Sequence, residues 1–260
     1  MKPSIDIRRP SPQVAEIWLD RPEVRNAFNE VVIAELSAAF RALGVESDLR
    51  AIVIGGRGKA FCAGADLMWM RSMAGYSRQQ NLADAEGLAE LLWLAWSCPV
   101  PLVGRLHGDC YAGGVGLAAA CDVLVASTDM HFCLSEARLG LLPATIGPYV
   151  VAALGEQAAR RYFTTAERFS AARAHQLGFV HELVAAETLD ATVEGIVAAL
   201  VANGPAAVRA CKQLVKDVAG RPIDAALRAD SARRIADIRA SAEGREGVQA
   251  FLDKREPSWR

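Results

Sequence analysis

The segment Leu106–Glu136, LHGDCYAGGVGLAAACDVLVASTDMHFCLSE, contains the pattern that decides the fold. The glycine pair Gly113-Gly114 is followed by small residues that can start a helix, and then by a β-branched run from Val123 to Ala126. A glycine pair at a helix start leaves backbone N–H groups without acceptors, where the helix dipole favours negative charge. This geometry suits an oxyanion, and Glu136 nearby could move protons. The same residues also fit a tight strand-to-helix turn and a surface glutamate, and the segment alone leaves both interpretations open.

This segment forms the second half of a repeated unit of helix, strand and glycine-rich turn. In the first half, Asn29 is expected to cap a helix that precedes a buried strand at residues 50–54 and a glycine-rich turn at 55–58. The apolar stripe of that helix is Val32, Leu36, Ala39, Phe40 and Leu43. In the second half, a helix over 79–96 leads to a strand over 101–106. Strands that alternate with helices predict an α/β fold with a parallel sheet and crossover helices.

The two ends of the chain differ from this repeat. Residues 5–19 are expected to form strand structure with a break at residues 10–12, where two prolines lie. After Pro143 the sequence is typical of helices separated by glycines. The predicted helices cover residues 147–154, 157–163, 171–177, 188–202, 205–218 and 223–251. We therefore expect a core domain over residues 1–198 and a C-terminal helical region over 199–260.

The composition excludes several classes of protein. With 260 residues, 52% of them apolar, the chain is long enough for a sizeable core. A net charge of -1 with scattered lysines and arginines does not indicate nucleic-acid binding. The N-terminus lacks the apolar region of a signal peptide, and no uncharged apolar run approaches the roughly 18 residues of a membrane span. The six cysteines form no C-x-x-C pair and indicate reduced thiols in a cytoplasmic protein.

The common catalytic and phosphate-binding motifs are absent from the sequence. Gly58-Lys59 is followed by Ala60 rather than Ser or Thr, which excludes a P-loop, and Phe61 stands where the third glycine of a dinucleotide fingerprint would be. No serine lies in G-x-S-x-G, no H-E-x-x-H occurs, and the four histidines lack metal-ligand spacing. Hydrolases, metalloenzymes and nucleotide-dependent enzymes are therefore disfavoured, and no metal is expected.

Two turns, at residues 61–67 and 112–114, and Glu136 remain to be explained. The sequence segments around them form an ordered series along nearly the whole chain: D-R-P at 20–22, N-A at 26–27, G-K-A-F-C-A-G-A-D-L at 58–67, the glycine-rich segment 108–114 with C-D at 121–122, S-E at 135–136, L-G-L-L-P at 139–143, S-A at 170–171, G-F-V at 178–180, E-G at 243–244 and K-R at 254–255. This series resembles the enoyl-CoA hydratase/isomerase family. The resemblance implies an α/β crotonase (ClpP/crotonase-like) fold of repeated ββα units with a C-terminal helical layer.

The resemblance also implies a set of catalytic residues. The thioester carbonyl of an acyl-CoA would lie between the backbone N–H groups of Ala65 and Gly113, which would stabilise an enolate oxygen. Small residues suit this role, since the thioester must approach the main chain closely. Glu136 matches a catalytic glutamate of the family and would deliver a proton to C2 and help to hold the water that attacks C3.

Coenzyme A is expected as part of the substrate, with no permanently bound cofactor. The family implies CoA contacts from Arg25, next to Asn26 and Ala27, and from the backbone of Ala63 to Leu67, including Ala65 and Asp66, around the adenine. Phe251 and Lys254 of the last helix are expected to reach CoA from a neighbouring subunit. The C-terminal region would accordingly serve the assembly of a homotrimer or a dimer of trimers.

The sequence departs from the family pattern at two places. Well-studied hydratases carry a second glutamate where this chain has Gly116, and the frequent Pro-Gly-Gly is replaced by residues 143–148, P-A-T-I-G-P. Three consequences stay open: hydration with another water-holding group, for which Asp109 and Tyr111 are candidates; double-bond isomerisation by a single carboxylate; or use of the freed volume by a branched or carboxylated acyl chain.

The residues around Glu136 resemble most closely the bacterial hydratases of 3-methylglutaconyl-CoA and isohexenylglutaconyl-CoA, which act in the breakdown of leucine and acyclic terpenes. Arg138 or Arg161 would then pair with a substrate carboxylate, although a solvated arginine is the simpler interpretation of each. Three functions remain: a 2-enoyl-CoA hydratase, an enoyl-CoA isomerase, or a CoA-thioester binder without catalytic activity.

Overall fold

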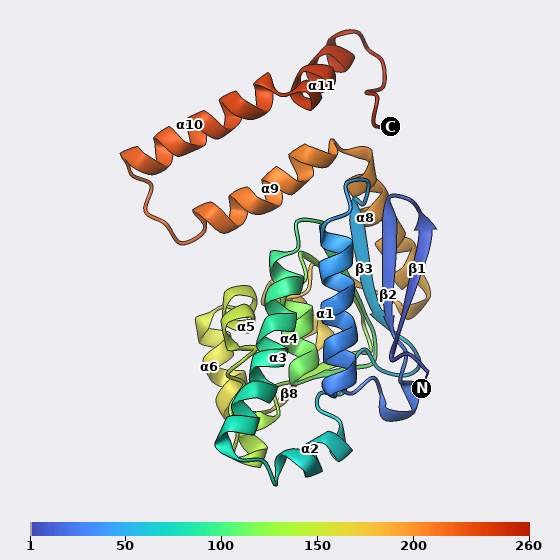
Figure 1. Ribbon diagram of the computed structural model, residues 1–260, viewed down its shortest axis with the longest axis vertical. Helices are drawn as coiled ribbons and strands as arrows, with labels where there is room; N and C mark the ends of the chain where they lie inside the picture. The colour runs from blue at the N-terminus through green and yellow to red at the C-terminus, as the bar shows by residue number, and fades with distance from the viewer. Residues whose placement is uncertain (1) are drawn as a thin grey trace.

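The computed structural model describes residues 2–260, which form two β-sheets flanked by helices (Figure 1). The strands of the larger sheet are β1 (Ile5–Ser11), β2 (Val14–Leu19), β3 (Ala51–Gly56), β4 (Leu102–Leu106), β6 (Val123–Ser127) and β9 (Glu182–Val184), adjacent in that order. The pair β1 and β2 is antiparallel, and each later pair is parallel. The predicted parallel sheet is thus confirmed. The predicted break at residues 10–12 covers the end of β1, where the register with β2 shifts, and the first residue of a hairpin turn at residues 12 and 13.

The first helix-and-strand unit forms as its sequence indicates. Helix α1 (Glu30–Gly44) begins after Asn29, whose side chain accepts a hydrogen bond from the amide of Val32 at 3.0 Å. All five residues of the predicted apolar stripe are buried. Every residue of β3 is also buried, as expected of an inner parallel strand covered on both faces.

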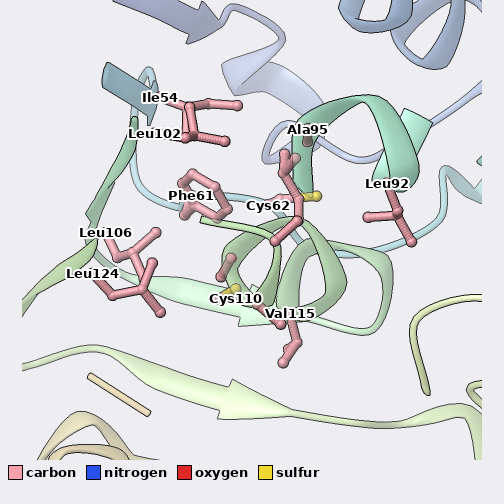
Figure 2. Close-up of a cluster of buried hydrophobic side chains, with 14 of the residues drawn as sticks. Ile54, Phe61, Cys62, Leu92, Ala95, Leu102, Leu106, Cys110, Val115 and Leu124 are labelled. Carbon is pink, nitrogen blue, oxygen red and sulfur yellow. The ribbon is translucent and has the colours of Figure 1, made fainter. Parts of the chain in front are cut away.

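The second unit contains helix α3 (Arg78–Ser97), strand β4 and helix α4 (Gly113–Ala119). A capping box at Ser77 and Gln80 fixes the start of α3. Figure 2 shows that side chains from both units meet in one buried cluster, including Ile54 of β3, Leu92 of α3 and Val115 of α4. The core therefore joins the elements that precede each glycine-rich turn.

The sequence did not predict the smaller sheet. Its strands, β5 (Asp109–Tyr111), β7 (His131–Cys133) and β8 (Arg168–Ser170), lie in that order, with β5 and β7 parallel and β7 and β8 antiparallel. Each has three residues, too few to produce a recognisable alternation of apolar and polar positions. This sheet places the segment before α4 beside the segment that leads to Glu136.

The predicted helices of the C-terminal part are corrected at one place. The predicted helix over 223–251 is divided into α10 (Ala225–Ala240) and α11 (Ala242–Leu252). Strands β8 and β9, which the sequence did not predict, lie between predicted helices. Ser241 causes the division: it has extended backbone angles, and its hydroxyl accepts a hydrogen bond from the amide of Gly244 at 3.0 Å. The other helices of this part are α5 (Gly147–Leu154), α6 (Glu156–Thr165), α7 (Ala171–Gln176), α8 (Leu189–Ala202) and α9 (Pro205–Val218).

Helices α9, α10 and α11 lie together at one end of the molecule, away from α2 (Leu67–Met73) at the other end (Figure 1). Helix α9 is tied to the body by Lys212, which bonds to Asp122 at 2.5 Å, and by Arg209, which donates to the carbonyl of Glu46 at 2.6 Å. Much of the apolar surface of α10, α11 and the preceding loop is exposed, at Ile223, Ile235, Val248, Phe251 and Leu252. The division at residues 198 and 199 stays a prediction, and it falls within α8.

No single helix among residues 2–260 is long and apolar enough to cross a membrane. The consecutive segments 186–202 and 205–218 meet the length and composition criteria only when taken together, and they are bent by 107° at their junction.

Candidate active site

Two turns that are distant in sequence are held together by backbone hydrogen bonds. Cys62, in the first turn, pairs with Cys110 of β5: its amide donates to the carbonyl of Asp109 at 3.2 Å, and its carbonyl accepts from the amide of Tyr111 at 2.9 Å. Gly114 fits against this pair, because a Cβ at that position would lie 2.8 Å from both Cβ and the carbonyl oxygen of Cys62. Only glycine permits such close approach of the two chains.

The backbone of Ala65 is oriented by Phe28. The amide of Phe28 donates to the carbonyl of Gly64 at 2.7 Å, and its carbonyl accepts from the amide of Asp66 at 2.8 Å. Ala65 lies between Gly64 and Asp66, the two residues bonded to Phe28 in this parallel bridge, so its own N–H points away from Phe28. The Ala65 amide donates to no acceptor among residues 2–260.

The second free amide belongs to Gly113, the first residue of α4. Ala112 precedes it with a φ of 45°, which turns the chain sharply, and donates its own amide to the carbonyl of Cys133 at 2.8 Å. The Gly113 amide has no acceptor within the described chain. A Cβ at Gly113 would lie 3.2 Å from Cδ2 of Phe28, the residue whose backbone pairs beside Ala65. Residues 65 and 113 therefore both lie beside Phe28.

Glu136 follows the central strand of the smaller sheet. Strand β7 places Cys133 beside Tyr111, and Glu136 begins the short 3-10 helix that starts after β7. Its Oε2 atom is buried and has no hydrogen-bond partner in residues 2–260. Burial raises the pKa of this carboxyl above its usual range. A buried carboxylate oxygen without a partner, on a segment bonded through Cys133 to the turn of Ala112 and Gly113, is typical of a functional site rather than of a surface turn.

The raised pKa of Glu136 predicts a pH-dependent stability effect. Below the ordinary carboxyl pKa of 4.5, Glu136 is protonated in both the folded and the unfolded chain. As the pH rises through the raised value, ionisation in the buried position lowers the stability of the folded protein. Glu136→Gln stays neutral, so its thermal midpoint is expected to exceed that of the unmodified protein at pH 8, with a smaller difference near pH 4.5.

Thermal unfolding followed by circular dichroism at both pH values checks this expectation. Glu167→Gln is the matched control, since Glu167 is exposed and its pKa is lowered by the hydrogen bond from Arg161. At pH 8 the thermal midpoint of Glu167→Gln should not exceed that of the unmodified protein. The same pH dependence for Glu136→Gln and the unmodified protein would contradict the assignment of a destabilising buried charge.

The predicted CoA-contacting residues near the N-terminus lie close to those of the first turn. The amide of Ala63 donates to the carbonyl of Arg25 at 3.0 Å, and Arg25 is exposed and lies 3.6 Å from Asp109. Ala27 is buried, and its carbonyl accepts from Arg21 at 2.8 Å.

The next two residues lie at the start of α2. The carboxylate of Asp66 is occupied within the protein, because it caps α2 through the amide of Met68 at 2.8 Å and accepts from Arg21 at 2.8 Å. Burial opposes ionisation of Asp66, but these hydrogen bonds outweigh it and lower its pKa. Leu67 is the exposed first residue of α2. The predicted role of Asp66 in CoA binding therefore concerns its backbone.

Phe251 and Lys254 are not brought to this turn within one chain. Both are exposed at the α11 end of the molecule, whereas α2 lies at the opposite end (Figure 1). A role in CoA binding requires a second copy of the chain, as the sequence analysis expected.

The structure gives other partners to the polar residues that sequence reasoning proposed for water or a substrate carboxylate. Tyr111 donates to Asp109 at 2.8 Å, and burial together with that contact raises the pKa of Tyr111 to about 12. Arg138 donates to the carbonyl of Ala166 at 2.6 Å, and Arg161 is paired with Glu167.

Arg168 was missed by sequence reasoning. It donates to Asp109 at 3.1 Å, and its guanidinium lies 5.6 Å from the centre of the Tyr111 ring. The unpredicted smaller sheet carries it there, since Arg168 begins β8.

The space at Gly116 is filled rather than free. A Cβ at Gly116 would lie 2.2 Å from Cγ2 and 2.6 Å from Cβ of Ile146, which is buried. The expectation that the missing glutamate leaves volume for an acyl chain at this position is therefore wrong. Ile146 was also missed, and its signal in the sequence was the altered segment at residues 143–148.

No cluster of residues suited to a metal ion occurs in residues 2–260, and no metal was expected. A cleft of about 440 Å³ lies elsewhere, between the larger sheet and α8. Trp18, Arg57, Arg105 and Asp190 are among the residues that line it, and none of the predicted site residues does. Several of its charges are paired within the protein, for example Arg105 with Asp190 at 2.5 Å.

The chain matches the family described as enoyl-CoA hydratase/isomerase over residues 10–260. It is similar to the solved structure of an enoyl-CoA hydratase from Shewanella pealeana ATCC 700345, with 38% identity, a TM-score of 0.95 and coverage of 98% of this chain and 96% of that one. It is also similar to the solved structure of an enoyl-CoA hydratase from Mycobacterium smegmatis, with 35% identity, a TM-score of 0.93 and coverage of 99% of each chain. Mevalonyl-coenzyme A hydratase sidH from Aspergillus fumigatus is 32% identical over 256 residues, which cover 96% of this chain and 93% of that protein.

Proposed function

Since the chain belongs to the enoyl-CoA hydratase/isomerase family and is an enoyl-CoA hydratase-type enzyme, we propose that Ala65, Gly113 and Glu136 together add water across the double bond of a 2-enoyl-CoA. The amides of Ala65 and Gly113 bind the thioester oxygen, and Glu136 transfers the proton at C2. One observation carries this assignment: two amides without acceptors in residues 2–260 lie on turns joined by backbone bonds. The second turn is bonded to the segment that leads to Glu136, whose buried Oε2 atom also lacks a partner in those residues.

The proposed reaction follows from charge development on the thioester. When the oxygen of water bonds to C3, the electron pair of the double bond moves toward C2 and the thioester oxygen becomes enolate-like. Two preorganised amides stabilise that negative charge. Glu136 receives a proton from the water and supplies one to C2, so it ends in the protonation state in which it began. A carboxyl whose pKa is raised by burial is suited to supplying a proton near neutral pH.

A branched acyl group, similar to 3-methylglutaconyl, is the finer proposal. It is supported by the residues around Glu136, which resemble branched-chain members of the family, and by the name of the fungal relative, a mevalonyl-coenzyme A hydratase. Arg168 is a further candidate for a substrate carboxylate beside Arg138 and Arg161, since it is exposed and lies against Tyr111, two residues before Gly113.

Double-bond isomerisation is the second candidate function, and Gly116 is the observation that favours it. Without a glutamate at position 116, Glu136 is the single family-matched carboxylate, and one carboxylate can shuttle a proton between two carbons of an enolate.

An absorbance assay separates the two functions. Hydration predicts that crotonyl-CoA and 3-methylglutaconyl-CoA lose their enoyl absorbance and incorporate solvent oxygen. Isomerisation predicts that a 3-enoyl-CoA gains conjugated absorbance without incorporating oxygen. If none of these thioesters changes although each binds, the protein is a binder and the proposed function is wrong.

Coenzyme A is proposed to bind along Arg25, Ala27 and the backbone of residues 63–67, with Phe251 and Lys254 supplied by a neighbouring copy. The exposed apolar residues of α10 and α11 support such an assembly. We propose a homotrimer or a dimer of trimers, so light scattering should give three or six times the 27.8 kDa of one chain. The cytoplasm remains the proposed location, supported by the free state of all six cysteines.

A further inference from the structure

The two departures from the family pattern, at Gly116 and at residues 143–148, meet in space. Ile146 lies immediately before α5, and its side chain stands where a side chain at position 116 would begin. A Cβ at Gly116 would come within 2.2 Å of Ile146 Cγ2, closer than any real contact. The two positions therefore form a reciprocal pair, in which the absence of a side chain on α4 accommodates a large one at residue 146.

The geometry of α4 places this pair beside the candidate site. Gly116 follows Gly113 by three residues, so both lie on one face of the helix. Side chains on a helix lean toward its N-terminus and cover the turn before their own Cα. The direction that Ile146 occupies therefore leads toward the turn of Ala112 and Gly113, where the free amide lies.

Ile146 is held firmly in this position. Its side chain is 1% exposed, and its carbonyl accepts from the amide of Val150 at 3.0 Å, which fixes it to the first turn of α5. Helix α5 packs against α4. A side chain fixed in this way keeps the space in front of Gly116 filled.

We propose that Ile146 is a specificity-determining residue that forms an apolar wall beside Gly113 and limits the bulk of the acyl chain. This inference rests on the proposed function, because it assumes that the thioester oxygen binds at the Gly113 amide. The wall takes the place of an acidic side chain on α4, so selection at this point depends on shape rather than on charge.

Binding of saturated acyl-CoA thioesters tests the wall without requiring turnover. Isothermal titration calorimetry with butyryl-CoA and 3,3-dimethylbutyryl-CoA gives the ratio of their dissociation constants. Ile146→Ala should shift this ratio toward the bulkier thioester by roughly tenfold or more, because a few carbon atoms in an apolar pocket change selectivity by that order. Ile146→Val should shift it less, in the same direction, and keeps the result interpretable if the alanine variant fails to fold.

Val150→Ala is the matched control, since Val150 is equally buried on α5 and lies one turn farther from the pair. It should lower the thermal midpoint and leave the ratio unchanged. If Ile146→Ala lowers the midpoint without moving the ratio, Ile146 is only a core residue and the inference is wrong. If Ile146→Ala changes the ratio of dissociation constants but the unmodified protein hydrates no enoyl-CoA, the proposed function is wrong and the role of Ile146 in acyl selection is supported.

Discussion

Glu136→Gln is expected to lower the turnover of crotonyl-CoA by roughly a hundred- to ten-thousand-fold, the usual contribution of a positioned acid or base. Glutamine keeps the size and polarity of the side chain but cannot exchange the proton at C2. The amides of Ala65 and Gly113 are unaffected by this change, so the affinity for a saturated acyl-CoA should remain nearly the same.

Steady-state kinetics, together with the dissociation constant of butyryl-CoA, separates these two effects. A loss confined to kcat supports a role for Glu136 in the chemical step. The exposed residue Glu167, changed to glutamine, should leave both quantities unchanged. Turnover that survives in Glu136→Gln would show that another group carries the proton.

Ala65→Pro is expected to lower kcat by roughly a hundred- to a thousandfold, which corresponds to the loss of one donor to a developing oxyanion, about 3 kcal/mol. Proline removes the N–H of residue 65, and this amide makes no hydrogen bond within residues 2–260 that the fold would lose. The thermal midpoint should therefore change less than the rate.

Ala65→Gly is the control for this substitution, since it retains the amide and removes only the methyl group. Its kcat should stay within a fewfold of the original value. Equal activity of the proline and glycine variants would remove Ala65 from the proposed pair of donors and leave Gly113 without its partner.

Local signals were sufficient to predict the elements that carry a strong pattern. Asn29 and the apolar stripe after it define α1, because capping and helical periodicity act within a few residues of each other. The run of buried residues in β3 is likewise visible in the sequence. The three-residue strands of the smaller sheet have no such pattern, since they are stabilised by pairing with distant segments. Ser241 divides two helices by one hydrogen bond, a signal too small to see within 223–251.

The candidate site shows the same distinction between local and distant information. The positions of Ala65 and Gly113 follow from motifs within a few residues, and the structure brings their turns together through Cys62 and Cys110. The meaning of Gly116 depends on Ile146, which lies in another segment, and the missing glutamate alone suggested empty volume. The sequence does not indicate that the side chain of Ile146 fills the space left by the missing side chain at Gly116.

The pairing of Cys62 with Cys110 has a practical consequence for chemical labelling. Burial raises the pKa of Cys62 to about 12 and that of Cys110 well above the ordinary thiol value, so neither presents a reactive thiolate near neutral pH. Cys211, by contrast, is exposed on α9. A maleimide dye should therefore attach to α9 and leave the two turns untouched, which makes Cys211 a natural position for a fluorescent reporter of what approaches the C-terminal helices.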